Sequence, residues 1–214
     1  MKKKIIIISA VIVFAIILII ILNVTANKTD RLLNMYKKMS NNQNFTFSME
    51  EVNEDFPYTV TTMQRGTDVS INMYSGGEHM TTLVVDGHAY YIIHSDKEYY
   101  DYGEDRTDIA DSVLFWLEDI TQKTYNTGKE EIDGKIYYYE EYDDEKAQFI
   151  IYADPNEASS IKTRFYFEKN ELKYIKNIIT TDDEVFEELI KIELKYDIDE
   201  SLFEIPDDYA EIET

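Results

Sequence analysis

The chain has 214 residues, of which 44% are hydrophobic and 14% aromatic, and it carries a formal net charge of −22. So acidic a surface repels phosphate backbones, which excludes nucleic-acid binding, and the aromatic content is higher than in disordered acidic tails. The sequence contains no cysteine, which excludes disulfides, thiolate metal sites, cysteine nucleophiles and a lipid attached to a signal cysteine.

The N-terminus has the pattern of a membrane anchor. Three lysines, Lys2 to Lys4, precede an uncharged run over residues 5–22, in which Ser9 is the only polar residue. At about 1.5 Å per residue a helix of that length reaches roughly 27 Å, close to the ~30 Å hydrocarbon core of a bilayer. We therefore expect a cytoplasmic basic N-terminus over residues 1–4, a transmembrane signal anchor over 5–24 and an extracytoplasmic domain over 28–214. The alternative is a signal peptide cleaved after Ala26, which would release a secreted protein.

A short helix is expected next. Thr29 is placed to cap it, and Leu32, Met35, Tyr36 and Met39 recur at helical spacing before a polar break at residues 41–43.

The chain then changes to strand patterns. Apolar and polar residues alternate, and Asp-Gly pairs at 86–87 and 133–134 each separate two such runs, which predicts tight hairpins. The expected strands cover residues 45–49, 57–65, 67–74, 80–85, 88–94, 129–132, 135–142, 149–152, 161–167, 172–180 and 185–196.

One amphipathic helix interrupts the strands over residues 108–120. Ile109, Val113, Trp116 and Leu117 form an apolar stripe at helical spacing, and Thr107 or Asp108 can cap its start. Trp116 is the only tryptophan of the chain.

These elements predict a mainly β domain with helices, of the α+β class. About ten strands on a meander need cover, and only two helices are available. The economical arrangement is a single strongly curved antiparallel sheet, or half barrel, with the helices on its concave face, preceded by the N-terminal transmembrane helix.

The order of elements resembles the LolA-type lipoprotein-carrier superfamily, which includes mycobacterial lipid-binding lipoproteins and periplasmic regulators of envelope stress. The resemblance rests on an N-terminal helix, on Asp-Gly turns followed by tyrosines within residues 85–91 and 132–138, and on the ending Asp-Glu-Ser-Leu-Phe-Glu-Ile-Pro at residues 199–206. It spans roughly residues 28–212. The resemblance implies an apolar cavity between sheet and helices that holds acyl chains, and it implies no catalytic residues.

If such a cavity exists, Ile109, Val113, Trp116 and Leu117 are its candidate lining residues. The alternative is that this stripe is ordinary core. No nucleophile-elbow, phosphate-loop or zinc-protease motif occurs in the sequence, so we expect no enzyme, no catalytic residue, no metal site and no cofactor.

Three other sets of residues are ambiguous. His79 and His94 should face each other across the hairpin, where they would bind a metal, respond to pH or simply lie exposed. The acidic residues Asp101, Glu104, Asp105 and Asp108 suit calcium or a solvated surface. The third set consists of tyrosines in runs, which favour either a sugar- or peptide-binding surface or plain strand propensity; they are Tyr90, Tyr91, Tyr99, Tyr100, Tyr102, Tyr137, Tyr138 and Tyr139.

Two functions follow from the sequence. The first is a membrane-anchored binding module that holds a lipid, an acylated molecule or another apolar ligand in the cell envelope. The second is a sensory or structural module that binds another envelope protein through its sheet surface, without a small-molecule ligand.

Overall fold

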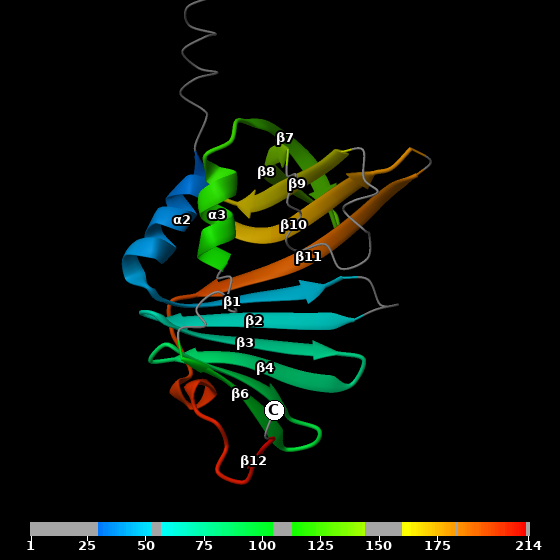
Figure 1. Cartoon of the computed structure of the whole chain (residues 1–214). Coiled ribbons are helices and arrows are strands. Elements are labelled where there is room, and N and C mark those ends of the chain that lie inside the picture. Colours follow the sequence, from blue (N-terminus) through cyan, green and yellow to red (C-terminus); the bar gives the residue numbers. More distant parts are fainter. Residues whose placement is uncertain (1–29, 53–56, 105–112, 144–159, 183, 213–214) are drawn as a thin grey trace, which may run out of the picture. The chain divides into compact units, whose positions relative to one another are not determined.

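In the described residues, the domain is built on one open sheet, whose order Figure 1 shows, and this sheet has twelve strands. The computed structural model describes residues 30–52, 57–104, 113–143, 160–182 and 184–212. The helices are α2 (Arg31–Asn42), α3 (Val113–Thr121) and the 3₁₀ helix η2 (Glu200–Phe203). The strands are β1 (Asn44–Glu51), β2 (Tyr58–Arg65), β3 (Asp68–Ser75), β4 (Glu78–Val85), β5 (His88–Ile93), β6 (Glu98–Glu104), β7 (Tyr125–Ile132), β8 (Lys135–Asp143), β9 (Ser160–Glu168), β10 (Glu171–Thr180), β11 (Val185–Lys195) and β12 (Ala210–Glu211).

The sheet joins two meanders. Strands β1 to β6 follow one another in space, as do β7 to β11, and the pairing of β1 with β11 connects the two series. All neighbours are antiparallel except β12, which pairs in parallel with β6. The order is β12-β6-β5-β4-β3-β2-β1-β11-β10-β9-β8-β7, so β12 and β7 are the outermost of the described strands.

Both predicted Asp-Gly hairpins are confirmed. Val85 pairs with His88, and Ile132 pairs with Lys135, which leaves two residues in each turn. Asp86 and Gly87 both have positive φ, at 54° and 79°. This is the conformation of a type I′ turn, whose twist matches that of the flanking strands and which Asp-Gly adopts readily.

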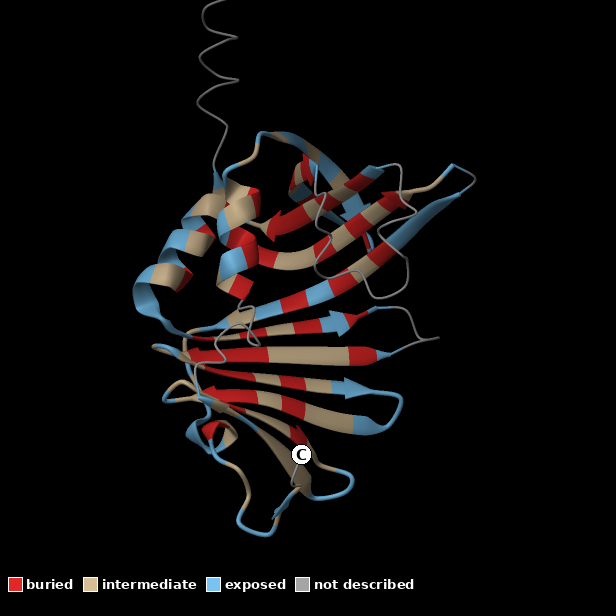
Figure 2. Ribbon diagram, viewed as in Figure 1, coloured by how far each residue is buried: buried red, intermediate tan, exposed pale blue. Residues whose placement is uncertain are grey.

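The main core lies between the two longer helices and one half of the sheet. Leu32, Met35 and Met39 of α2 and Trp116 and Leu117 of α3 are buried (Figure 2). They pack against apolar residues of β1, β8, β9, β10 and β11: Phe45, Phe47, Met49, Tyr142, Phe165, Phe167, Leu172, Ile175, Ile190 and Ile192.

Helix α2 starts at a carboxylate from a distant strand. Glu140 of β8 is fully buried, and its two oxygens accept hydrogen bonds from the backbone N–H groups of Arg31 at 2.8 Å and Leu32 at 3.2 Å. The expected cap, Thr29, lies outside the described residues.

The C-terminal segment covers the opposite face in the other half of the sheet. Phe203 of η2 is buried against Met63, Leu83 and Ile92 of β2, β4 and β5. Thr62 of β2 is the cross-strand partner of Phe47 in β1, so it points to the same face as this residue of the main core. Met63 is the next residue along β2. Because successive side chains of a strand point to opposite faces, the segment and the helices lie on opposite faces of the sheet. We call the face that carries the helices the helix face, and the other the groove face.

The expectation of a strongly curved half barrel with helices on its concave face is wrong. The sheet is open, it has twelve strands, and the helices pack only toward one half of it. The two ends of the sheet are covered on opposite faces, by the helices at one end and by η2 at the other. Hydrophobic alternation reports which side chains share a face, but it does not report how far the sheet bends or where the cover lies.

Several expected elements differ in detail. The sequence pattern missed β6 and the two-residue β12, because neither has clear alternation of apolar and polar residues. The expected strand over residues 149–152 and the apolar run over 5–22 lie outside the described residues. Within the described residues, no helix is long and apolar enough to span a membrane.

Candidate functional site

The predicted ligand-pocket residues lie in the main core. Val113, Trp116 and Leu117 are at most 2% exposed, and Ile109 lies outside the described residues. The Trp116 ring packs 5.4 Å from that of Phe165, centroid to centroid. The geometry of these three residues is that of packed core, and neither of the two hollows described below is lined by α3.

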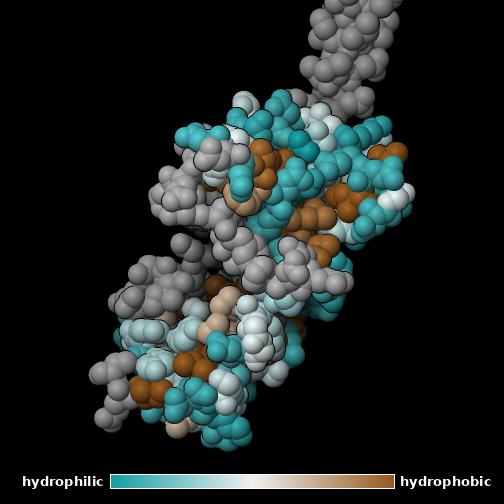
Figure 3. Space-filling view, turned by 90° about the vertical axis from the view of Figure 1, so that its right-hand side faces the viewer, coloured by the Kyte–Doolittle hydropathy of each residue, from teal (hydrophilic) through white to brown (hydrophobic). Residues whose placement is uncertain are grey.

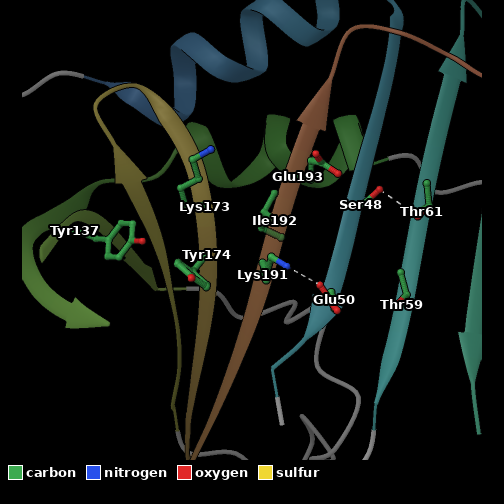
Figure 4. Close-up of a pocket in the computed structure, with 10 residues that line it drawn as sticks. All are labelled: Ser48, Glu50, Thr59, Thr61, Tyr137, Lys173, Tyr174, Lys191, Ile192 and Glu193. Carbon is green, nitrogen blue, oxygen red and sulfur yellow. Dashed lines mark hydrogen bonds and ion pairs between the residues drawn. The ribbon is translucent and has the colours of Figure 1, made fainter. Parts of the chain in front are cut away.

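A polar hollow lies on the groove face instead. It has a volume of about 550 Å³ and crosses the strands where the two meanders join (Figure 4). Its lining residues come from β1, β2, β8, β10 and β11: Ser48, Glu50, Thr59, Thr61, Tyr137, Lys173, Tyr174, Lys191, Ile192 and Glu193. The strand register explains why they gather. Tyr174, Lys191, Glu50 and Thr59 are successive cross-strand partners, so their side chains form one row.

Charges and hydroxyls occupy the floor of this hollow. Lys191 Nζ lies 2.9 Å from Glu50 Oε2, and the two side chains are 60% and 57% exposed. The hydrogen bond to Glu50 raises the pKa of Lys191 above its ordinary value. Beside this pair, Thr61 Oγ1 donates to Ser48 Oγ at 3.1 Å. An exposed ion pair is worth little to stability, so both charged groups are available to a ligand at small cost.

Tyrosines form one wall. The rings of Tyr137 and Tyr174 meet edge to face at 5.3 Å between centroids. They belong to a small apolar cluster with Ile132 and Tyr166. Tyrosine combines an apolar ring with a polar tip, which suits contact with polar chains.

A network of ion pairs and hydrogen bonds around Glu130 lies beside the tyrosine wall and links its strands. Arg164, Lys176 and the Tyr166 hydroxyl all bind the Glu130 carboxylate, at 2.8, 2.8 and 2.7 Å. Burial opposes the ionised form of Glu130, but the hydrogen bonds from Lys176 and Tyr166 outweigh burial and lower its pKa. Burial and the bond to Glu130 raise the pKa of Tyr166. The strands under the tyrosines are therefore tied together by charge-assisted bonds.

A second hollow adjoins the first. It has a volume of about 460 Å³, and Glu50 and Thr59 line both hollows. Its other lining residues include Tyr74, Gly76, Gly77 and Glu78 at the β3–β4 turn. Tyr74 is 50% exposed. Together the two hollows make one groove across β10, β11, β1, β2 and β3, which we call the sheet groove.

The predicted pairing of His79 with His94 is confirmed. The His94 N–H donates to the His79 carbonyl at 3.1 Å, and the two rings stack 3.6 Å apart with 4° between their planes. The nitrogen lone pairs of an imidazole lie in its ring plane, so two parallel stacked rings do not converge on one ion. This geometry disfavours the metal interpretation.

The acidic residues of β6 do not form a described ion site. Asp101 accepts a hydrogen bond from the backbone N–H of Gly103 at 2.7 Å and contacts His88 Nε2 at 2.5 Å. The Gly103 bond and then the His88 contact lower the pKa of Asp101. Asp105 and Asp108 lie outside the described residues. Among the described residues, no group of three or more histidines and carboxylates is placed to hold a metal ion.

Sequence reasoning missed most of the sheet groove. It noted Tyr137 among the tyrosine runs, but not Lys191, Glu50 or Thr59, which come from separate strands. Only the pairing of β1 with β11 brings these residues together. Glu50 and Lys191 are 141 positions apart in the sequence, and no local sequence pattern indicates a contact over such a separation.

Comparison with known proteins gives no family. No family model matches the chain, and no curated protein matches it. A crystal structure of an uncharacterized conserved protein from Thermus thermophilus is similar to it with a TM-score of 0.49 and 7% sequence identity, over 85% of this chain and 96% of that one.

Proposed function

We propose that this chain is a binding module that holds a segment of another protein in the sheet groove. The observation that supports the proposal is the groove itself, a hollow of about 550 Å³ with hydroxyls, charges of both signs and tyrosines in its lining, adjoined by a second of about 460 Å³. An extended polypeptide offers N–H and C=O groups to such hydroxyls and carboxylates. Its side chains can pack on the tyrosine rings.

The lining favours a polypeptide over a lipid. The floor of the groove carries the charged residues Lys191 and Glu50 and the hydroxyl groups of Thr59 and Thr61. An acyl chain bound there would leave these polar groups without water or a hydrogen-bond partner. In the view of Figure 3, the described residues present a largely hydrophilic surface with separate hydrophobic patches. Lipid binding, which the LolA-type resemblance implies, stays a prediction. Three of the residues predicted to line the lipid cavity, Val113, Trp116 and Leu117, are buried in the main core.

The proposed setting is the outer side of a cell membrane. The lysines and the apolar run over residues 5–22 support an uncleaved anchor, which would present the domain to other envelope proteins. A tethered module needs only moderate affinity for a partner in the same membrane, because tethering raises the effective concentration.

The test compares two arginine variants of the full chain. Thr59→Arg places a long side chain where the two hollows meet, and Ile136→Arg adds the same side chain at a position that is 63% exposed and outside the groove. Each protein is expressed with its N-terminal segment, cross-linked with formaldehyde in intact cells and purified. Co-purifying proteins and extracted lipids are then measured by mass spectrometry.

We expect one or a few proteins to co-purify at near-equal amounts with the parent chain and with Ile136→Arg, and to be reduced about tenfold or more with Thr59→Arg, the effect of about 1.4 kcal/mol in binding. Equal recovery from both variants would contradict the groove as the binding surface. Stoichiometric lipid in all three samples, without a groove-dependent protein, would favour the carrier function.

A further inference from the structure

Three stacked rings cross the groove face next to the C-terminal segment. The Tyr74 ring lies 3.9 Å from that of His79, with 14° between the planes, and His79 stacks on His94 at 3.6 Å. Tyr209, from the C-terminal segment, meets His94 edge to face at 5.5 Å. The stack therefore ends on the segment that covers this half of the sheet.

A chain of hydrogen bonds fixes the proton of His94. The Thr81 hydroxyl donates to Asn72 Oδ1 at 2.8 Å, so its oxygen accepts from His94 Nε2 at 2.8 Å. His94 Nδ1 then carries the lone pair and accepts from the Tyr209 hydroxyl at 2.9 Å. Neutral His94 with its proton on Nε2 satisfies every group in this chain, and a proton on Nδ1 would remove the lone pair that accepts from Tyr209, so that this bond would have to reverse or break.

Among the described residues, no carboxylate contributes to the pKa shift of either histidine. The facing groups are Tyr74 of β3, His79 of β4 and Tyr209 of the C-terminal segment, and none is a carboxylate. Further along the row of Tyr74, Glu50 is bound to Lys191. On the C-terminal segment, Asp208 is bound to Lys97 at 2.6 Å.

The same surroundings lower the pKa of both histidines. Burial lowers the pKa of His94, and burial together with the charge of a protonated His94 lowers that of His79. A proton on either ring puts a cation 3.6 Å from the other ring.

The attachments of the C-terminal segment differ in strength. Phe203 is 4% exposed and is packed on apolar residues. The last residues are held by smaller contacts, namely the exposed ion pair of Asp208 with Lys97 and the strand β12, which has two residues and binds β6 through Ala210 N to Lys97 O and Ile212 N to Tyr99 O, both at 2.9 Å. Tyr209 directly precedes β12. A two-residue edge strand is a low-stability element, so one side-chain bond next to it matters.

We propose that His79 and His94 form an acid-sensitive latch that holds Tyr209 and β12 on the sheet at neutral pH and releases residues 204–212 when it takes up protons. Release uncovers the edge of β6, where a strand of another chain can pair. The latch does not depend on occupancy of the sheet groove.

The direction of the pH effect on docking follows from the difference in histidine pKa between the docked and released states. The docked state lowers the histidine pKa values, while the released state returns them toward about 6.5. Docking free energy is therefore fully present above about pH 6.5 and is lost as the pH falls through the docked-state pKa. Each pKa unit by which docking lowers a histidine weakens docking about tenfold in acid.

Hydrogen–deuterium exchange of the full chain in detergent micelles tests the latch. Exchange of peptides that contain residues 97–100 and 210–212 is measured at pH 7.5 and 5.5 and corrected for the intrinsic pH dependence of amide exchange. Peptides of β10 and β11 serve as the internal reference for global unfolding.

In the parent chain we expect corrected exchange in the two segments to be about tenfold faster at pH 5.5 than at pH 7.5, with β10 and β11 unchanged. The double variant His79→Gln/His94→Gln should lose this response. His88→Gln should keep it, because His88 pairs with Asp101 and lies outside the stack. A double variant that responds like the parent, or a parent that does not respond, would overturn the latch.

Tyr209→Phe covers the case in which the double variant fails to fold. It removes only the hydroxyl that binds His94. We expect fast exchange of residues 210–212 already at pH 7.5 and little further change at pH 5.5. Exchange at pH 7.5 equal to that of the parent would contradict a holding role for the Tyr209–His94 bond.

Discussion

Buried carboxylates organise this domain at the level of single residues. Glu140 starts helix α2 from another strand, and the Tyr142 hydroxyl donates to it at 3.1 Å. Burial raises the pKa of Glu140, although hydrogen bonds from Arg31, Leu32 and Tyr142 oppose that rise. Its three donors show why a fully buried acid is tolerated here.

Replacing Glu140 with alanine should destabilise the domain by about 1–3 kcal/mol. The backbone N–H groups of Arg31 and Leu32 would lose their acceptor in a buried site, and such loss is costly. Urea denaturation followed by circular dichroism measures the effect. Glu141→Ala is not a neutral control, because Glu141 binds Arg164; Glu131→Ala, on the neighbouring strand and exposed, is suitable. Equal stability of the two variants would contradict the capping role.

Trp116 and Phe115 are neighbours in α3 with opposite environments. Trp116 is 2% exposed and Phe115 is 54% exposed. Trp116→Ala should cost about 3–5 kcal/mol, as expected for a large buried aromatic, whereas Phe115→Ala should cost below about 1 kcal/mol. Both free energies come from chemical denaturation. Similar losses from the two variants would show that α3 is not packed as described.

At the level of elements, β11 carries another buried acid, Glu188, which is bound to Asn177 of β10. Glu188 is 7% exposed and accepts hydrogen bonds from Asn177 at 2.9 Å and Tyr58 at 3.2 Å. Burial raises its pKa, and the charge of Glu51 adds to the rise. Because the pKa of Glu188 is raised in the folded state, this group contributes stability below its unfolded-state pKa of about 4.3. That contribution is lost as the pH rises through the folded-state pKa.

We therefore expect Glu188→Gln to flatten the pH dependence of stability. Between pH 4.5 and 7, the parent should lose stability from this group, while the amide of the variant does not titrate. The free energies of unfolding of both proteins, measured across this range, give the comparison. A parallel pair of curves would mean that Glu188 is ionised equally in the folded and unfolded states.

The sequence predicted local elements well and their arrangement poorly. The Asp-Gly hairpins, the helix around Trp116 and the pairing of His79 with His94 follow from contacts between residues close in the chain. The pairing of β1 with β11 and the packing of η2 against β3 and β4 are contacts between distant parts of the chain. An alternation of apolar and polar residues shows which side chains share a face of a strand, but it does not show which strands pair with each other.

Those long-range contacts also explain the wrong fold class and the missed groove. Met63, Leu83 and Ile92 look like core residues for the same face as the helices, but they lie under the C-terminal segment on the other face. The sheet groove arises at the seam between the two meanders, where Lys191 meets Glu50. Neither residue has a local motif.

At the scale of the whole molecule, the two proposed sites lie on one face of the sheet. The sheet groove lies at the seam of the meanders, and the histidine latch lies toward β5 and the C-terminal segment. Tyr74 belongs to both, since it lines the second hollow and stacks on His79. The helix face, in contrast, holds the main core.

Site-specific photocrosslinking in living cells tests the central claim most directly. A photoreactive amino acid replaces Thr59 or Thr61 in the sheet groove, or Ile136 outside it, in the full chain. We predict a discrete protein adduct from both groove positions and none from Ile136, with the adduct lost when Lys191→Glu is added. Equal adducts from all three positions, or lipid adducts alone from the groove, would contradict a protein-binding sheet face.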